Sequence, residues 1–529
     1  MKKIYLFATM AMTAMQMQAQ DVAATLDTYA AAALATEDLN GSARYVGMGG
    51  AMDALGADIS TIGTNPAGIG LFRKNQFSGS LSVNIQEGGK TFQDGSKTHV
   101  SFDQMGFVFS TPSGKTGFIN FAFNYHKNRN FNYVLSAVNA LNGSAQCNQT
   151  TLKAMNDKDL FYYNKEEGRY YYNSLAASQL DALYIRNMIH DRETDEVCCF
   201  EGSNYEFDRA RTGYISEFDF NLSGNINNRV YLGLTVGVNY VNYKGYSEYY
   251  ETLNSTEISD VLITDNQKIT GYGYNVKAGV IFRPIAESPF RIGASVSTPT
   301  FYRLTTDNYT TIGGNVDHEA AKEDFRFNTP WKFGLSLGHT IGSNVALGAV
   351  YEYADYGTCD MRTIDGEYYN YWADNYYSES SSDNVMKRHT ENTLKGVSTF
   401  KIGAEFKADK DVALRLGYNY VSPIYNESGV RDQTLFSPGV YYASTTDYTN
   451  WKDTHRFTAG VGITFDQFRL DLAYQYSMRK GDFYPFMKSY SAAYIDDETG
   501  ETVTLVNGCN LVEVKDNRHQ IMASLTYTF

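Results

Sequence analysis

Residues 230–240, VYLGLTVGVNY, place an apolar or aromatic side chain at every even position and mostly glycine or polar side chains at the odd ones. A period of two is that of a β-strand with two unlike faces. The same alternation returns in residues 414–420 (LRLGYNY) and 468–476 (FRLDLAYQY). The apolar face continues for about 9–11 residues and often ends in tyrosines, which is typical of a transmembrane β-strand and its aromatic girdle.

Fourteen segments of this kind follow residue 75, and they predict an all-β fold, a 14-stranded antiparallel transmembrane β-barrel. Short connections alternate with long ones, which is typical of barrels with brief periplasmic turns and longer outer loops. We expect strands near 76–86, 97–110, 116–126, 212–225, 229–244, 269–283, 289–304, 325–340, 343–356, 394–408, 410–423, 453–466, 467–480 and 516–529. The long connections are 127–211, 245–268, 305–324, 357–393, 424–452 and 481–515.

The alternation also predicts which residues meet lipid. Leu234 and Leu472 belong to the apolar faces, whereas Gly233 and Ala473 belong to the opposite faces, which we expect to meet water. An arginine should therefore be tolerated better at Gly233 or Ala473 than at Leu234 or Leu472.

Both ends of the chain carry export signals. Two lysines and a short apolar run open the sequence, so residues 1–19 are predicted to be a secretory signal peptide. The last strand ends in Phe529, and a terminal aromatic residue resembles the assembly signal of bacterial outer-membrane barrels. We therefore expect a protein of the Gram-negative cell outer membrane, with outer-membrane lipid and the barrel-assembly machinery as partners.

Composition excludes several other classes of protein. The net charge of −14 is opposite to the basic footprint of a nucleic-acid-binding protein. Beyond the N-terminus, no apolar run approaches the ~20 residues of a membrane-spanning helix. The eight histidines are scattered without the spacing of a metalloprotease or an i,i+4 pair. We expect no enzymatic activity, no cofactor and no metal site.

The segment before the first strand carries a series of short motifs. Residues 43–51 read ARYVGMGGA, Ala57-Asp58 follows, and Asn65-Pro66-Ala67-Gly68 comes next. This series resembles the FadL/TodX family of outer-membrane channels for long-chain fatty acids and aromatic hydrocarbons. Residues 291–300, 329–334 and 415–423 resemble later motifs of the same family. In one departure, Asp58 is followed by Ile59, so the family's paired acids are reduced to one.

The resemblance implies three parts of the chain. They are the signal peptide 1–19, an N-terminal hatch over 20–75 that lies inside the lumen, and the barrel with long extracellular loops over 76–529. The hatch would hold or release the ligand through its glycine run and its rigid turn. The residues that we assign to this ligand and hatch role are Gly47, Gly49, Gly50, Asn65, Pro66, Ala67 and Gly68.

Basic residues on the inward faces are candidates for a second role. They are Lys277, Arg291, Lys332 and Arg415. In one interpretation these cations meet the carboxylate of a fatty acid while apolar hatch residues hold its tail. In the other, they belong to a solvated, ion-paired interior, because charges are tolerated in a wet lumen.

All five cysteines fall in predicted outer loops, which in an exported protein favours disulfides. A link from Cys147 to Cys198 or Cys199 would close the 127–211 connection. The vicinal pair and the odd number of cysteines leave the connectivity open.

The favoured hypothesis is a passive, monomeric outer-membrane channel for hydrophobic small molecules such as long-chain fatty acids. Two alternatives stay open. One is a surface scaffold or secretion-associated barrel whose extracellular loops are the functional part. The other is a haem-capturing outer-membrane receptor, although the sequence offers no clear pair of axial ligands.

Overall fold

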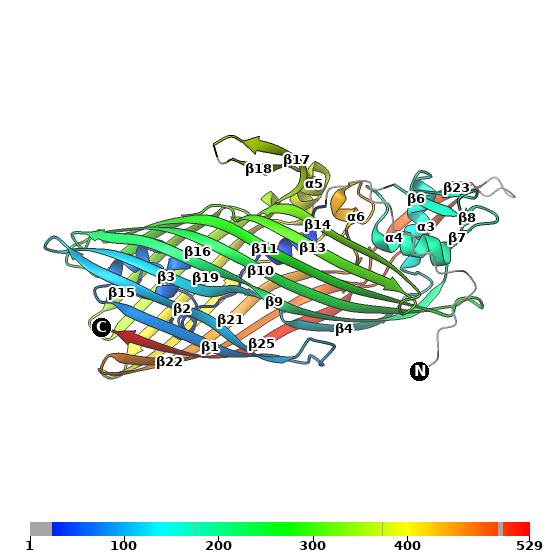
Figure 1. Cartoon of the computed structure of the whole chain (residues 1–529). Helices are drawn as coiled ribbons and strands as arrows, with labels where there is room; N and C mark the ends of the chain where they lie inside the picture. The colour runs from blue at the N-terminus through cyan, green and yellow to red at the C-terminus, as the bar shows by residue number, and fades with distance from the viewer. Residues whose placement is uncertain (1–23, 174, 373, 496–500) are drawn as a thin grey trace.

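The computed structural model describes residues 24–173, 175–372, 374–495 and 501–529, and the predicted signal peptide lies outside these residues. The chain forms a closed antiparallel β-barrel of 14 strands (Figure 1). The barrel closes where the first strand, β1, pairs with the last, β25, from Gln76↔Thr528 to Gln86↔Arg518. The predicted fold class is confirmed.

The wall follows the order of the sequence. Its strands are β1 Gln76–Gln86, β2 Thr98–Ser113, β3 Gly117–Asn130, β4 Tyr133–Ala140, β9 Gly202–Ile226, β10 Val230–Leu253, β11 Asp260–Phe282, β12 Arg291–Ser297, β13 Phe301–Ile312, β14 Asp317–Asn328, β15 Lys332–Ile341, β16 Val345–Asp355, β19 Gly396–Lys407, β20 Val412–Val421, β21 Tyr448–Phe465, β22 Phe468–Tyr484 and β25 Val512–Thr528.

The remaining elements lie in the N-terminal segment or in the outer loops. The N-terminal segment contains α1 Thr28–Ala35, α2 Ala43–Gly47, η1 Ile59–Gly63 and η2 Pro66–Leu71. The outer loops contain α3 Cys147–Asn156, β5 Phe161–Asn164, β6 Arg169–Tyr172, α4 Gln179–Tyr184, η3 Ile185–Ile189, β7 His190–Asp191, β8 Glu196–Val197, η4 Tyr356–Thr358, β17 Asp360–Asn370, β18 Asn375–Ser382, α5 Asn384–Thr393, α6 Pro438–Tyr441, β23 Tyr490–Ile495 and β24 Thr502–Asn507. Among the described helices, none has the length and apolar character needed to cross a membrane.

Three of the 14 wall strands are each divided into two segments. The first is β3 with β4, which pair with successive parts of β9, and the other two fall within predicted strands. The predicted strand 289–304 becomes β12 and β13, which pair with successive parts of the same neighbour, β11. The predicted strand 325–340 becomes β14 and β15. Pro299 and Pro330 lie at the two breaks, where proline cannot donate a ladder hydrogen bond. Thr329 N donates to the carbonyl oxygen of Thr300 at 3.2 Å, so the breaks lie side by side.

The predicted long loops 245–268 and 305–324 are largely strand. β10 continues to Leu253, β11 begins at Asp260, and β13 and β14 form a hairpin. The expected boundaries were wrong because these outer parts lack the apolar alternation. A strand that extends beyond the bilayer has no lipid-facing side, so its ladder persists without the period-two pattern.

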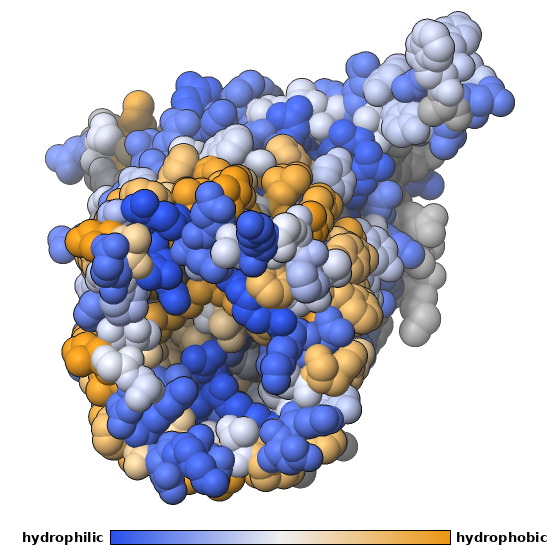
Figure 2. All heavy atoms as spheres, turned by 90° about the vertical axis from the view of Figure 1, so that its left-hand side faces the viewer, coloured by the Kyte–Doolittle hydropathy of each residue, from blue (hydrophilic) through white to orange (hydrophobic). Residues whose placement is uncertain are grey.

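The apolar faces form a belt on the outside of the barrel. Along β10, the outward side chains of Leu232, Leu234, Val236 and Val238 are exposed, Leu234 by 51%. Figure 2 shows the end with the short turns: hydrophilic residues line its opening and hydrophobic residues surround it. Such an outer surface suits lipid and not water.

We expect Leu234→Arg to lower the free energy of unfolding by about 2–4 kcal/mol, because it places a guanidinium near the middle of the lipid-facing belt. The measurement is guanidinium-induced unfolding of protein reconstituted in lipid vesicles. Leu511→Arg is the matched control, since Leu511 is 48% exposed and precedes β25 on the outer side. Equal losses in the two variants would show that the belt is misplaced.

Candidate functional site

Each short element of the N-terminal segment begins at a capping side chain. Asp27, Ser42, Asp58 and Asn65 accept hydrogen bonds from backbone N–H groups at the starts of α1, α2, η1 and η2. At η2, Asn65 Oδ1 accepts from Ala67 N at 3.2 Å, and Pro66 occupies the first helical position. Proline is favoured there because that N–H has no helical partner. The Asn-Pro-Ala-Gly motif thus forms a capped, rigid turn.

A row of glycines on the inner wall receives this segment. Gly338, Gly348, Gly403 and Gly417 are direct register partners on the adjacent strands β15, β16, β19 and β20. A Cβ atom at Gly348 would overlap the carbonyl oxygen of Ala51, and similar overlaps occur at Gly403 and Gly417 with residues 48–49. The wall therefore lacks side chains where the segment packs against it.

The inward positions 233 and 473 do not face water, which corrects the expectation from the sequence. A Cβ atom at Gly233 would overlap the backbone of Pro66. Ala473 is 4% exposed and packs against Ala43 and Val46 of the N-terminal segment. The sequence pattern gave the correct face for both residues. What it could not reveal was that the N-terminal segment fills this part of the lumen.

The predicted hatch residues lie at this contact with the wall. Gly49 and Gly50 have positive φ angles of 64° and 79°, which glycine adopts readily. Gly47 lies against Gly460 of β21, and Ala67 packs with Tyr231 and Ile281. Asn65, Pro66 and Gly68 belong to the η2 turn. None of the seven lines either cavity described below, so their role in ligand binding stays a prediction.

The four predicted lumen cations all have partners. Lys277 Nζ lies 2.8 Å from Glu217 and 3.1 Å from Asp219. Arg415 lies 2.7 Å from Glu405 and 2.8 Å from Asp471. Lys332 forms an ion pair with Glu37, and Arg291 donates to the carbonyl oxygen of Leu55 at 2.7 Å. Lys277 and Lys332 also line the larger of the two cavities described below, whereas Arg291 and Arg415 line neither of these cavities.

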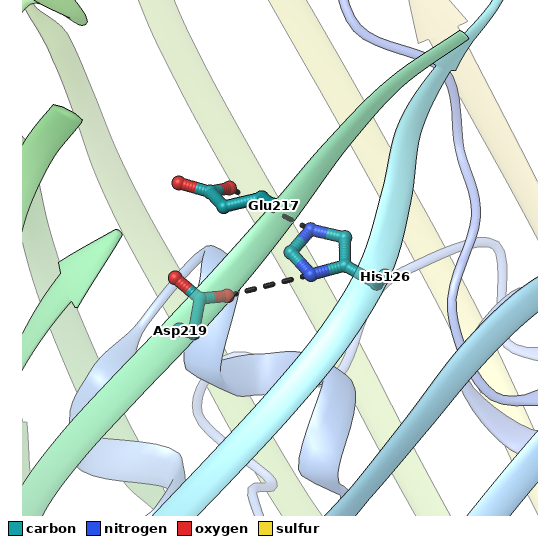
Figure 3. A group of neighbouring side chains, drawn as sticks. All are labelled: His126, Glu217 and Asp219. Atoms are coloured by element: carbon teal, nitrogen blue, oxygen red, sulfur yellow. Dashed lines mark ion pairs between the residues drawn. The ribbon is translucent and has the colours of Figure 1, made fainter. Parts of the chain in front are cut away.

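His126 completes the group around Lys277. Its ring nitrogens lie 3.7 Å from Glu217 and 3.4 Å from Asp219 (Figure 3). Imidazole and two carboxylates are common metal ligands. Here, however, the Lys277 ammonium contacts both carboxylates and already supplies the positive charge. The arrangement is therefore an ion-paired cluster on β3, β9 and β11, which the sequence alternation did not reveal.

A cavity of about 120 Å³ lies beside α1. Aromatic and aliphatic side chains form much of its wall, among them Tyr29, Tyr243, Ile269, Tyr425 and Trp451. Six arginines also line it: Arg129, Arg209, Arg211, Arg431, Arg479 and Arg518. The cavity therefore combines apolar surface with a concentration of guanidinium groups.

These guanidinium groups are only partly satisfied. The buried Nε atoms of Arg129, Arg209, Arg211 and Arg431 have no hydrogen-bond acceptor within the described residues. Carboxylates nevertheless pair with most of the six, such as Asp27 with Arg431 at 2.7 Å. Arg211 has no ion pair in the described part of the chain. Buried donors without acceptors are uncommon, and they mark a place where an anionic acceptor would bind favourably.

A second cavity, of about 210 Å³, adjoins the first. Thr36, Arg129, Ile424, Trp451 and Arg479 line both. The second cavity continues past Asp38 and Asn40 toward His126 and Lys277. Residues 36–40, which join α1 to α2, form part of the lining of the second cavity.

The wall beside the second cavity has a break in its backbone ladder. The pairing of β2 with β3 stops at Gln104↔His126, although β2 starts at Thr98 and β3 continues to Asn130. Side chains bridge the remaining gap, as where Lys127 Nζ donates to Ser101 Oγ at 3.0 Å. Asn40 Nδ2 of the N-terminal segment donates to the carbonyl oxygen of Lys127 at 3.0 Å. Thus the N-terminal segment holds one side of this break.

The connection between β4 and β9, residues 141–201, forms a packed cap at the outer end, built on α3, α4 and the ends of the wall strands. It is shorter than the predicted loop 127–211, because both ends of that range are strand. Cys147 is buried there and Cys198 and Cys199 are exposed; all five cysteines are free thiols in the structure. Burial raises the pKa of the Cys147 thiol well above its usual range. This disfavours the thiolate that disulfide exchange requires. Because the thiols are free, the structure contains no link from Cys147 to Cys198 or Cys199. That disulfide stays a prediction, which non-reducing peptide mapping would test.

Comparisons with known proteins bear on the fold. No protein-family model and no curated protein sequence matches the chain. A FadL homologue of Pseudomonas aeruginosa superposes with a TM-score of 0.50 at 12% identity, over 94% of this chain and 100% of that one. The toluene transporters TbuX of Ralstonia pickettii and TodX of Pseudomonas putida superpose with TM-scores of 0.45 and 0.44, each at 12% identity over 93% of this chain and 99% of theirs. The first likeness confirms the FadL-type barrel fold that the motifs implied.

Proposed function

We propose that this chain is an outer-membrane channel for the passive uptake of hydrophobic small molecules, with long-chain fatty acids among its substrates. The cavity beside α1 is the observation that carries the proposal. Its aromatic and aliphatic wall suits an acyl chain, and its unsatisfied guanidinium Nε atoms suit a carboxylate. An amphipathic anion meets both requirements.

In this proposal the N-terminal segment acts as a hatch. An apolar molecule gains little from a water-filled bore, since the bilayer core is a better solvent for it. The break between β2 and β3 lies beside the second cavity, and the contact of Asn40 with Lys127 joins the hatch to that break. Movement of the segment would open the bridged gap and release the ligand sideways.

The test is binding of labelled oleate and labelled toluene to the purified full-length protein. We expect Arg211→Gln to weaken oleate binding about tenfold or more, because one charge-assisted hydrogen bond contributes about 1.5–3 kcal/mol. Toluene carries no charge, so its binding should change little. Arg211→Lys should retain part of the oleate affinity, since it keeps the charge.

Lys410→Gln is the matched control, because Lys410 is an exposed turn residue with only a weak contact to Asp411. It should bind both ligands as the unmodified chain does. Equal oleate binding by Arg211→Gln and the unmodified chain would contradict the assignment of the cavity. If the folded protein bound neither ligand, the channel proposal would fail in favour of a surface scaffold, a role to which the packed outer cap is suited.

A further inference from the structure

Three arginines form a row across the outside of the wall. Arg303 of β13 is the register partner of Arg326 of β14, and Arg326 is the register partner of Arg362 of β17. Their strand neighbours Tyr302, Phe327 and Met361 are buried on the opposite face. The three guanidinium groups therefore project from the same, outer face and line one open groove.

Acids and arginines are equal in number around the row, but the partners of the three guanidinium groups are unequal. Like charges on directly opposed strand positions repel each other. Arg362 forms an ion pair with Asp360 at 2.8 Å, whereas Arg326 donates to the neutral carbonyl oxygen of Ser378. The Arg303 guanidinium has no hydrogen bond or ion pair within the described residues.

Two acids also line the groove, Asp365 and Glu379, and neither forms an ion pair with the arginines in the part of the chain that the structure describes. The groove therefore retains guanidinium donors without acidic partners. An anion from outside the chain would supply acceptors that the protein itself does not.

The row lies at the outer edge of the apolar belt. One register step toward the barrel centre, Tyr274 pairs with Phe301, and these side chains are 51% and 40% exposed. Tyr272, 64% exposed, pairs with Arg303 itself. On the outer side of Arg303 and Arg326, the next pair of β13 and β14 on the same face is polar: Thr305 donates a hydrogen bond to Asp324 at 2.6 Å. Aromatic girdles mark the level of lipid head groups, so the arginines lie at that level.

An aromatic hairpin stands beside the row. Strands β17 and β18 leave the barrel wall and project from it, with their turn directed toward the end that carries the short turns (Figures 1 and 2). Near the turn, Tyr371, Trp372 and Tyr376 are 87%, 100% and 66% exposed. Tryptophan and tyrosine prefer the membrane interface, where an aromatic ring meets lipid and its polar atom meets water.

We propose that Arg303, Arg326 and Arg362 bind the phosphate of a glycolipid head group in the outer leaflet, with the turn of the β17–β18 hairpin in contact with the lipid beside it. A phosphate offers several acceptor oxygens, and planar guanidinium groups bind it through paired hydrogen bonds. One phosphate between the arginines removes their mutual repulsion. The site is on the outside of the wall, so it is independent of the proposed transport function.

The test is native mass spectrometry of the full-length protein in mild detergent, titrated with diphosphoryl lipid A and with its dephosphorylated form. We expect the diphosphoryl lipid to bind at least about tenfold more tightly, since each charge-assisted hydrogen bond contributes on the order of 1.5 kcal/mol or more. The variant Arg303→Gln/Arg326→Gln should lose this preference. Lys115→Gln/Lys410→Gln removes the same charge from two exposed turns at the other end of the barrel and should retain it.

Heat-modifiable gel migration confirms that each variant is a folded barrel. Equal binding of the two lipids, or an unchanged preference in Arg303→Gln/Arg326→Gln, would overturn the proposal. Displacement of the lipid by inorganic phosphate at an equal concentration would show a site for free phosphate and would also overturn it.

A second measurement tests the hairpin without altering the arginines. Tryptophan fluorescence of Trp331→Phe is compared with that of Trp331→Phe/Trp372→Phe in vesicles that contain brominated lipid. The difference between the two signals comes from Trp372. Quenching of this signal by bromine is the expected result, and a Trp372 signal quenched only by acrylamide in the water would overturn the placement of the hairpin.

Discussion

Gly348→Val should displace the N-terminal segment and abolish uptake of a hydrophobic substrate while the barrel stays inserted. The new side chain meets the carbonyl oxygen of Ala51, and the backbone there cannot shift without moving the neighbouring contacts at Gly403 and Gly417. Overpacking of this kind costs about 1–3 kcal/mol or more. The outward belt is unchanged, so insertion and strand pairing should persist.

Two measurements follow this displacement. Hydrogen–deuterium exchange should show that amides in residues 40–70 lose their protection, because α2, η1 and η2 lose their support from the wall. Labelled oleate uptake should fall to the level of empty vector, since displacement of residues 40–70 removes Tyr45, Gly63 and Thr64 from the wall of the second cavity.

Gly79→Val is the control, because the nearest atom to a Cβ at Gly79 is 3.9 Å away. It should leave both the exchange pattern and uptake unchanged. Normal protection of residues 40–70 in Gly348→Val would contradict the role of the glycine row in seating the segment.

Lys277→Met should destabilise the barrel by about 3–5 kcal/mol, the usual cost of leaving buried charges without their partner. Glu217 and Asp219 are 3% and 0% exposed, and Lys277 is the amine that contacts both. Without it, the two adjacent carboxylates keep only His126 and the neutral amide donors of Asn239 and Asn275, and no permanent positive charge contacts them. The measurement is guanidinium-induced unfolding in lipid vesicles.

The triple variant Lys277→Met/Glu217→Gln/Asp219→Asn distinguishes a structural role for Lys277 from a ligand role. It removes the buried negative charges together with the positive one, so most of the lost stability should return. Lys410→Met, at an exposed turn, should change stability little. A Lys277→Met variant as stable as the unmodified chain, with oleate binding lost, would instead assign Lys277 to the ligand.

The fold was largely predictable because lipid imposes a strict pattern on a strand. The predicted strand 76–86 has the bounds of β1, and 229–244 begins within one residue of β10. The prediction failed where lipid is absent. Beyond Tyr240 the outer half of β10 reads VNYKGYSEYYETL, in which neither face is consistently apolar, yet its ladder with β11 continues to Thr252↔Asp260.

The candidate site was less predictable because it is assembled from distant residues. Arg129 and Arg211 come from the two ends of the predicted outer loop 127–211 and Arg431 from the predicted loop 424–452, and no spacing relates them. The cations chosen from strand alternation were on the correct face. Their partners, however, lie on other strands, as Glu217 on β9 does for Lys277 on β11. A period of two identifies the face of a strand and not the side chains that meet across the lumen.

The central claim is that this barrel admits hydrophobic molecules through the N-terminal segment. The most direct measurement is uptake of labelled oleate and labelled toluene by cells that lack their own channel and express the full-length chain. The account predicts uptake above empty vector for the unmodified chain and for Gly79→Val, and none above vector for Gly348→Val. Uptake equal to empty vector, with a heat-modifiable barrel present in the outer membrane, would contradict it.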